Sequence, residues 1–334
     1  MKKNKNSLML GWQKSKVWER KEWEAMEERK RKKTFRWRKW VPIFIMMSPG
    51  LIYLLVNNYL PMFGLVIAFK KVNFQLGIWE SPWAGFSNFT YLFKTPEALT
   101  ITRNTLLYNA AFITVNTGLS LSFALFITEM KSKFCKKIYQ SAVLLPYLMS
   151  AVIVSYIVYA LLSPDKGMVN NSILKPLGKK PVSWYMEPKY WPFILLLVNA
   201  WKGVGYNCLV FIAGLSGISP GFYEAARLDG ASKWQEIFYI SLPCMKTSII
   251  TLVLLQIGRI FYSDFGLFYQ VPMNSGALFD VTNTIDTYVY RSLLQLGNIG
   301  MASAAGFYQS IVGFGLILVC NALVRRMDKD SALF

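Results

Sequence analysis

The residue types able to do chemistry are few in this chain. Among 334 residues there is no histidine, and the four cysteines, Cys135, Cys208, Cys244 and Cys320, show no Cys-x-x-Cys spacing. Such a set is not typical of a metal site. The sequence has no carboxylate pair within an apolar stretch and no Gly-x-x-x-x-Gly-Lys-Ser/Thr phosphate-binding loop. We therefore expect no catalytic residue and no metal ligand, and no cofactor bound by this chain.

Three ionisable residues lie inside apolar stretches: Lys202, Arg259 and Asp264. A charge at the centre of a bilayer costs roughly 2.5–3.5 kcal/mol, so each should face protein or a water-filled cavity. On one continuous helix Arg259 and Asp264 would lie about 140° apart. One interpretation is structural ion pairs between helices. The other is a polar pathway, whose further lining would come from Trp201, Tyr206, Asn207 and Tyr262, although the aromatic positions also suit helix packing.

A second group lies in the polar segment 219–230, which has the signals of a short helix. Ser219 is a favourable N-cap, Pro220 suits the first helical position, and the alanines that follow favour helix. Gly230 is placed to end the helix in a left-handed conformation.

Another helix start follows at once. Ser232 and Gln235 have capping-box spacing, and we expect this second helix to run to Pro243. The product is a helix–glycine–helix elbow. Its residues Phe222 and Tyr223 are too apolar to be left in solvent without a partner.

The elements that must position these residues are membrane spans. The chain is 54% hydrophobic and 16% charged, against about a quarter charged in soluble domains. A span needs about 20 apolar residues, which predicts an all-α integral membrane fold with six transmembrane helices. The predicted spans are 41–60, 105–126, 138–162, 191–213, 247–267 and 300–324, with the elbow at 219–243 and tails at 1–40 and 325–334. Asn57, Asn58 and Pro61 leave the outer end of the first span open.

Positive charge sets the expected orientation. Of 37 Lys and Arg residues, 15 lie in the basic tail, 1–40. With that tail, the predicted inner segments carry 25 and the outer loops 10, which places both termini in the cytoplasm. Such a tail beside a span is typical of an orientation signal and of contact with anionic membrane lipids. The net charge of +19 therefore does not indicate nucleic-acid binding, for which there is no motif.

The predicted outer loops 70–104 and 183–191 are rich in aromatic residues. They form either a belt at the membrane interface or a landing surface for an external partner.

The elbow resembles a known family. Glu224-Ala225-Ala226, then Gly230, then Ile240-Ser241-Leu242-Pro243, with these gaps, is similar to the EAA loop of binding-protein-dependent ABC importer permeases. The resemblance extends to Arg103-Asn104-Thr105-Leu106, Leu145-Pro146-Tyr147 and Pro164-x-x-Gly167-x-x-Asn170, which look like the maltose-type, sugar-importing permeases. The segments 264–270 and 325–334 resemble a subgroup that handles complex oligosaccharides.

The resemblance implies the ABC importer permease fold in a bacterial cell membrane and no enzymatic activity of this chain. It implies a second permease, usually a different chain, two copies of a cytoplasmic ATPase that hold ATP and Mg, and an extracellular solute-binding protein. It also implies that the elbow couples to the ATPase through Phe222, Tyr223, Glu224, Ala225, Ala226 and Gly230. The alternative is an ion-coupled secondary transporter, which would need more intramembrane acidic groups than Asp264.

The cargo implied by the resemblance is a sugar, which needs hydrogen-bonding groups and flat aromatic faces. The intramembrane polar and aromatic residues supply both. Because Lys202 and Arg259 are cations, one hypothesis is that the cargo includes acidic oligosaccharides such as uronate-containing fragments. Neutral oligosaccharides are the alternative, with Arg259 paired to an acid on the partner permease.

Overall fold

The computed structural model of the protein describes residues 37–94, 96–295, 297–327 and 332, and these contain helices and loops with no β-strand. The predicted tails 1–40 and 325–334 lie largely outside the described residues. The chain divides into two units, Met1–Gly64 and Leu65–Phe334. An all-α fold was predicted and is confirmed.

The first span is one helical stretch from Trp40 to Phe69. It begins as α2 (Trp37–Leu54), passes through the π-turn η1 (Leu55–Tyr59) and ends as the 3-10 segment η2 (Leu60–Phe69). Pro61 lacks an N–H and its ring disturbs the preceding turn. The widened π-turn before it absorbs that disturbance, so the helix changes type there and does not end.

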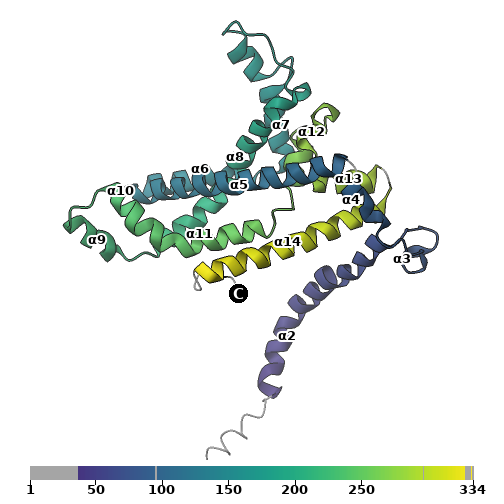
Figure 1. Ribbon diagram of the computed structural model, residues 1–334. Coiled ribbons are helices and arrows are strands. Elements are labelled where there is room, and N and C mark those ends of the chain that lie inside the picture. The colour runs from purple at the N-terminus through teal and green to yellow at the C-terminus, as the bar shows by residue number, and fades with distance from the viewer. Residues whose placement is uncertain (1–36, 95, 296, 328–331, 333–334) are drawn as a thin grey trace, which may run out of the picture. The chain divides into compact units, whose positions relative to one another are not determined.

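In the second unit, further helices are long and apolar enough to cross a membrane (Figure 1). They are α5 (Pro96–Glu129), α8 (Trp191–Ser216), α14 (Ile299–Met327) and the continuous helix Lys233–Ile257. At 1.5 Å per residue, the 34 residues of α5 extend for about 51 Å. That exceeds the hydrocarbon thickness, so α5 reaches beyond it.

The third predicted span, 138–162, is not one straight helix. It consists of α6 (Lys133–Leu148) and α7 (Ala151–Leu162), which meet at an angle of 96°. Pro146 weakens the last turn of α6. Ser150 then adopts an extended conformation, and its hydroxyl accepts a hydrogen bond from the Ile153 backbone N–H at 3.3 Å, which starts a new helix. With this bent pair counted as one span, the described residues contain up to six.

The fifth predicted span, 247–267, is also different. The elbow's second helix does not end at Pro243 but continues from α10 (Lys233–Glu236) through the π-turn η7 (Ile237–Ser241) into α11 (Leu242–Ile257). Pro243 occupies the first turn of α11, directly after the π-turn, where its missing N–H is tolerated. The helix then ends at Ile257, ten residues before the predicted end of the span.

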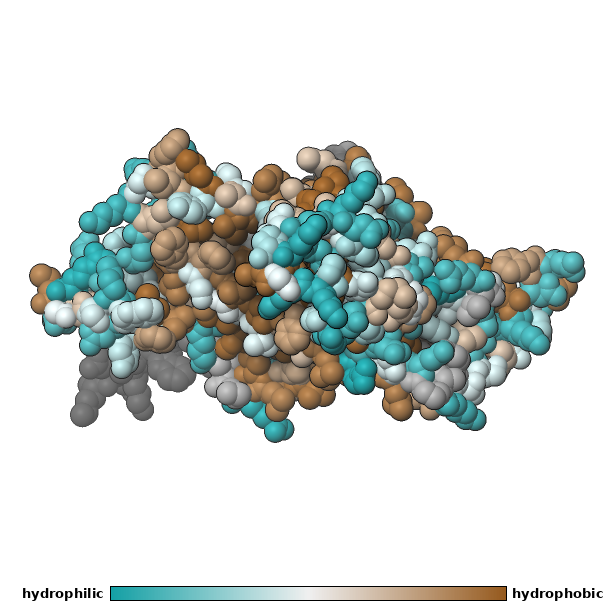
Figure 2. Space-filling view, turned by 90° about the horizontal axis from the view of Figure 1, so that it is seen from above, coloured by the Kyte–Doolittle hydropathy of each residue, from teal (hydrophilic) through white to brown (hydrophobic). Residues whose placement is uncertain are grey.

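Close packing joins the second unit. A Cβ atom on Gly205 of α8 would overlap the carbonyl oxygen of Val143 on α6, so only glycine allows this helix crossing. Buried aromatic residues fill the space between α5, α8 and the segment after α11, with ring centroids of Tyr108 and Phe268 4.9 Å apart. Figure 2 shows apolar side chains over much of the middle of the viewed face and polar side chains at the end that carries α9 and α10.

Asn170 fixes the loop between α7 and α8. Its Nδ2 donates to the carbonyls of Pro164 at 3.0 Å and Val182 at 2.9 Å, and its Oδ1 accepts from the Val182 N–H at 3.2 Å and the Trp184 Nε1–H at 2.9 Å. A Cβ on Gly167 would overlap the backbone of the turn before it. The Pro164-x-x-Gly167-x-x-Asn170 pattern therefore has a structural role in this loop.

Candidate functional site

The elbow begins with α9 (Pro220–Leu228). Ser219 takes the N-cap position, but its side chain makes no capping hydrogen bond. Gly230 has a φ of 83°, as predicted. Its N–H donates to the carbonyl of Arg227 at 3.1 Å, and the Ala231 N–H donates to that of Ala226 at 2.9 Å. These two bonds form a Schellman motif, which ends α9 and sets the direction in which the chain leaves it.

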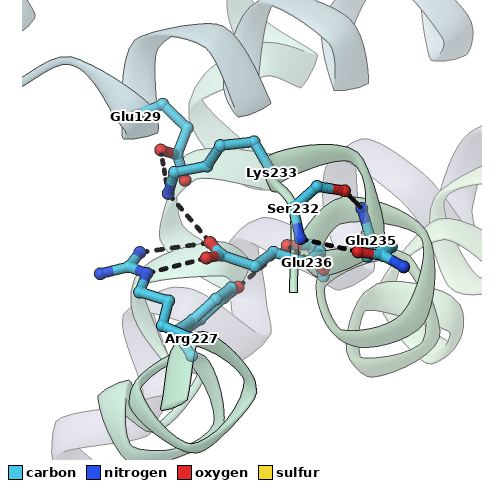
Figure 3. A network of polar contacts seen from close by, with 8 residues as sticks. Glu129, Arg227, Ser232, Lys233, Gln235 and Glu236 are labelled. Carbon is cyan, nitrogen blue, oxygen red and sulfur yellow. Dashed lines mark hydrogen bonds and ion pairs between the residues drawn. The ribbon is translucent and has the colours of Figure 1, made fainter. Parts of the chain in front are cut away.

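The capping box at the next helix start was predicted and is confirmed (Figure 3). The Gln235 N–H donates to Ser232 Oγ at 3.4 Å, and the Ser232 N–H donates to Gln235 Oε1 at 2.7 Å. The turn between α9 and α10 is therefore defined from both sides by local contacts.

An ion cluster that was not predicted from the sequence connects the elbow to the rest of the unit (Figure 3). Glu236, only 2% exposed, accepts hydrogen bonds from Arg227 Nε at 2.8 Å and Nη2 at 3.2 Å and from Lys233 Nζ at 2.9 Å. Lys233 Nζ also lies 2.8 Å from a carboxylate oxygen of Glu129, the last residue of α5. The cluster therefore joins α9, α10 and the end of α5.

The cluster keeps Glu236 ionised. Hydrogen bonds from Arg227, assisted by Lys233, lower the pKa of the Glu236 carboxyl to about 2, although its burial opposes the shift. The i, i+3 spacing of Lys233 and Glu236 was a local signal of their pairing. Glu129 lies more than 100 positions earlier in the chain, so its part required the three-dimensional structure.

The elbow presents a mixed surface. Glu224, Ala225 and Gly230 are exposed, and the side chains of Phe222 and Leu228 are 59% and 89% exposed. Among the other residues expected to couple to an ATPase, Ala226 is half-buried, and the half-buried Tyr223 makes a hydrogen bond with Ser241 at 3.0 Å. An exposed carboxylate beside large exposed apolar side chains is typical of a docking surface.

A cavity of about 630 Å³ lies between α5, α6, α8, α11 and the chain after α11. Of the residues expected to line a pathway, the cavity brings together Tyr206, Asn207, Arg259, Tyr262 and Asp264. Trp201 lines a separate apolar cavity of about 760 Å³, and Lys202 is not among the residues that line either one.

Asparagine and glutamine side chains give this cavity its polar character. Asn109, Asn116, Asn199 and Gln256 line it and were not identified from the sequence. The seven-residue spacing of Asn109 and Asn116, which places both on one face of α5, was the available signal. Asn116, 9% exposed, donates to Asn199 Oδ1 at 2.8 Å. Its own Oδ1 accepts no hydrogen bond from the described part of the chain.

Flat aromatic surface lies beside these amides. The rings of Tyr147 and Tyr206 both line the cavity and stack with centroids 5.1 Å apart. Tyr262 also lines the cavity, and its hydroxyl makes a hydrogen bond with Ser310 at 2.9 Å.

The two charged residues of the cavity are not paired with each other. Asp264 Oδ1 accepts from the Leu267 N–H at 3.2 Å and so caps the next helical turn. The Arg259 side chain is exposed and makes no hydrogen bond or ion pair within the described residues. The guanidinium of Arg259 is therefore free to bind an anionic ligand.

Comparison with known proteins gives consistent matches. Residues 117–329 match the family described as "Binding-protein-dependent transport system inner membrane component". Protein LplB of Bacillus subtilis (strain 168) is 31% identical, over 88% of this chain and 91% of that protein. The polygalacturonan/rhamnogalacturonan transport system permease protein YteP of the same strain is 30% identical, over 86% and 89%. A chain in the crystal structure of a bacterial ABC transporter involved in the import of the acidic polysaccharide alginate superimposes with a TM-score of 0.79. It is 32% identical, and the match covers 87% of this chain and 97% of that one.

Proposed function

The chain belongs to the family of binding-protein-dependent transport system inner membrane components, and from this premise we propose that it imports oligosaccharides that carry carboxylate groups. It is a multi-pass permease subunit of a carbohydrate ABC importer, as the family and relatives indicate. Family membership does not fit the alternative of an ion-coupled secondary transporter. The acidic class of cargo is the new part of the proposal.

The position of Arg259 is the single observation on which the proposal of acidic cargo depends. Arg259 lines the cavity and makes no ion pair within the described chain, and a guanidinium binds a carboxylate through two parallel hydrogen bonds. The stacked pair of Tyr147 and Tyr206 offers apolar faces to sugar rings. Asn116 offers a free carbonyl oxygen to a sugar hydroxyl.

The relatives support the same class of cargo. YteP is named for the transport of polygalacturonan and rhamnogalacturonan, and the transporter of known structure is involved in the import of alginate, an acidic polysaccharide. Both share about a third of their residues with this chain over most of its length. Arg259 supplies a physical reason why this chain should also accept acidic cargo.

Coupling to ATP forms the second part of the proposal. Phe222, Glu224 and Gly230, with the neighbouring elbow residues, dock on a separate cytoplasmic ATPase, of which two copies hold ATP and Mg. A second permease completes the pathway, a solute-binding protein delivers the sugar from outside, and both termini lie in the cytoplasm. Movement of the docked elbow passes to α5 because the ion cluster joins Lys233 to Glu129.

Replacing Arg259 tests the cargo class. Uptake of matched neutral and uronate-bearing oligosaccharides is measured for Arg259→Gln, with Arg259→Lys retaining the charge and Lys202→Gln as a control outside the cavity. A hydrogen bond to a charged group contributes about 1.5–3 kcal/mol, so Arg259→Gln should raise KM roughly tenfold to hundredfold for the uronate cargo and much less for the neutral one. Equal losses for both cargoes, or no loss for either, would mean that Arg259 does not select the cargo and that the proposed acidic class is wrong.

A further inference from the structure

The cavity's charged residues, Arg259 and Asp264, lie in a segment without regular helix between the end of α11 at Ile257 and the next helical turn, which begins at Phe265. Side-chain amides bind the backbone of this interrupted segment. Asn109 Nδ2 of α5 donates to the carbonyls of Ile260 at 2.9 Å and Tyr262 at 3.0 Å. Non-helical backbone at membrane depth is tolerated only where it is buried in protein or lines a cavity, and these side chains satisfy its carbonyl groups.

A second group of partners comes from the other side. Gln309 Nε2 of α14 donates to the carbonyl of Phe261 at 2.7 Å and to Asp286 Oδ2 at 3.2 Å. Asp286, on α13 (Ile285–Leu294), also accepts hydrogen bonds from the Ser263 N–H at 2.6 Å and the Ser263 Oγ–H at 2.8 Å. We refer to Asn109, Asp286 and Gln309 as the clamp.

The interruption determines what the cavity contains. On an unbroken helix Arg259 and Asp264 would lie about 140° apart, and the sequence indicated that they do not share a face. In the structure both line the same cavity, together with Tyr262 and Ser263. The change is possible because the chain leaves the helix between them, in the conformation that the clamp holds.

Two members of the clamp act from outside the cavity. Asn109 lines the cavity itself, whereas Asp286 and Gln309 are not among its lining residues, and Gln309 is 2% exposed. Any effect of Asp286 or Gln309 on cargo therefore has to pass through the backbone of the segment that they hold.

We propose that Asp286 and Gln309 are positioning residues that set the affinity for cargo by holding the interrupted segment so that Arg259, Tyr262 and Asp264 face the cavity together. This inference rests on the proposed function, because it assigns the clamp to the same site. A clamp that only stabilises the fold would lower the amount of folded protein without changing the affinity of the molecules that do fold.

The first test uses the purified chain alone and follows amide hydrogen exchange over residues 258–265. Gln309→Met keeps the length of the side chain but removes its donors, and Asp286→Asn removes the charge. Thr282→Val is the matched control, because it removes another buried hydrogen bond, from Thr282 to the carbonyl of Leu278, outside the segment. Both clamp variants should speed exchange in the segment about tenfold, and the control should not. Unchanged rates in both clamp variants would overturn the proposal.

The second test measures uptake into vesicles that contain the assembled importer, with trigalacturonate and a neutral trisaccharide as cargo. The clamp variants should raise KM for trigalacturonate about tenfold, with Vmax within about twofold of the wild type and a smaller effect on the neutral sugar. Lower Vmax with unchanged KM would mean a purely structural role and overturn the inference. Absence of ATP-dependent uptake by the wild type would overturn the proposed function, and the exchange rates would still decide whether the clamp holds the segment.

Discussion

Substitution of Gly230 tests the elbow most selectively. Gly230 has a φ of 83°, a left-handed conformation that costs a residue with a Cβ about 1–2 kcal/mol. A Cβ atom on Gly230 would meet no atom within 4 Å, so the main cost of Gly230→Val is the strain of the backbone conformation. If the elbow leaves this conformation, it also loses the two Schellman hydrogen bonds, each contributing about 1 kcal/mol.

A cost of 1–2 kcal/mol lowers the population of the native elbow roughly five- to thirtyfold relative to the alternatives. We therefore expect Gly230→Val to accumulate in the membrane in normal amounts but to lose most of its bound ATPase. The assay is co-purification of the ATPase with the tagged chain, followed by sugar-stimulated ATP hydrolysis.

Gly230→Asn is the matched control, because asparagine also adds a side chain in open space but adopts the left-handed conformation far more readily. It should retain most of the bound ATPase. Full sugar-stimulated hydrolysis in Gly230→Val would refute the reasoning. Equal damage in both variants would show that the surface, and not the backbone conformation, is what matters.

Two further predictions concern the ion cluster and the orientation. Glu236→Gln should destabilise the elbow by about 1–2 kcal/mol, since its two cationic partners are half-exposed, and limited proteolysis should cleave the elbow faster; equal resistance would contradict the cluster's role. The folded-state pKa of Glu236 is lowered to about 2. The cluster's contribution to the stability of the elbow is therefore complete above the ordinary carboxyl pKa of about 4.3 and is lost as the pH falls towards 2. The resistance of the elbow to proteolysis should be the same at pH 7 and pH 6. In intact cells an impermeant thiol reagent should label a single cysteine placed in 165–190 but not Cys135, and external labelling of Cys135 would contradict the orientation.

The elbow could be predicted because its determinants are local. Gly230, Ser232 and Gln235 act on backbone groups within a few positions of themselves, so their spacing in the sequence is sufficient evidence. The predicted end of the elbow's second helix at Pro243 was wrong, because a π-turn just before a proline lets the helix continue. No pattern of residue types indicated this π-turn.

The interruption after Ile257 could not be predicted for the opposite reason. The apolar stretch continues through it, and the groups that stabilise it, Asn109, Asp286 and Gln309, come from distant parts of the chain. Trp201 was expected to line the pathway, yet on α8 it lies about 160° around the helix from Asn199 and lines the apolar cavity instead. The residue types showed which side chains are polar or aromatic enough to line a pathway. Which of them line the cavity depends on the rotation of each helix and on this interruption.

The most direct test of the central claim is uptake of trigalacturonate by vesicles that contain this chain, its partner permease and the ATPase. We expect uptake only when ATP is present on the side of the elbow and the solute-binding protein on the other side, and we expect Arg259→Gln to abolish the preference over a neutral trisaccharide. Uptake driven by an ion gradient without ATP, or an unchanged preference in Arg259→Gln, would contradict the account.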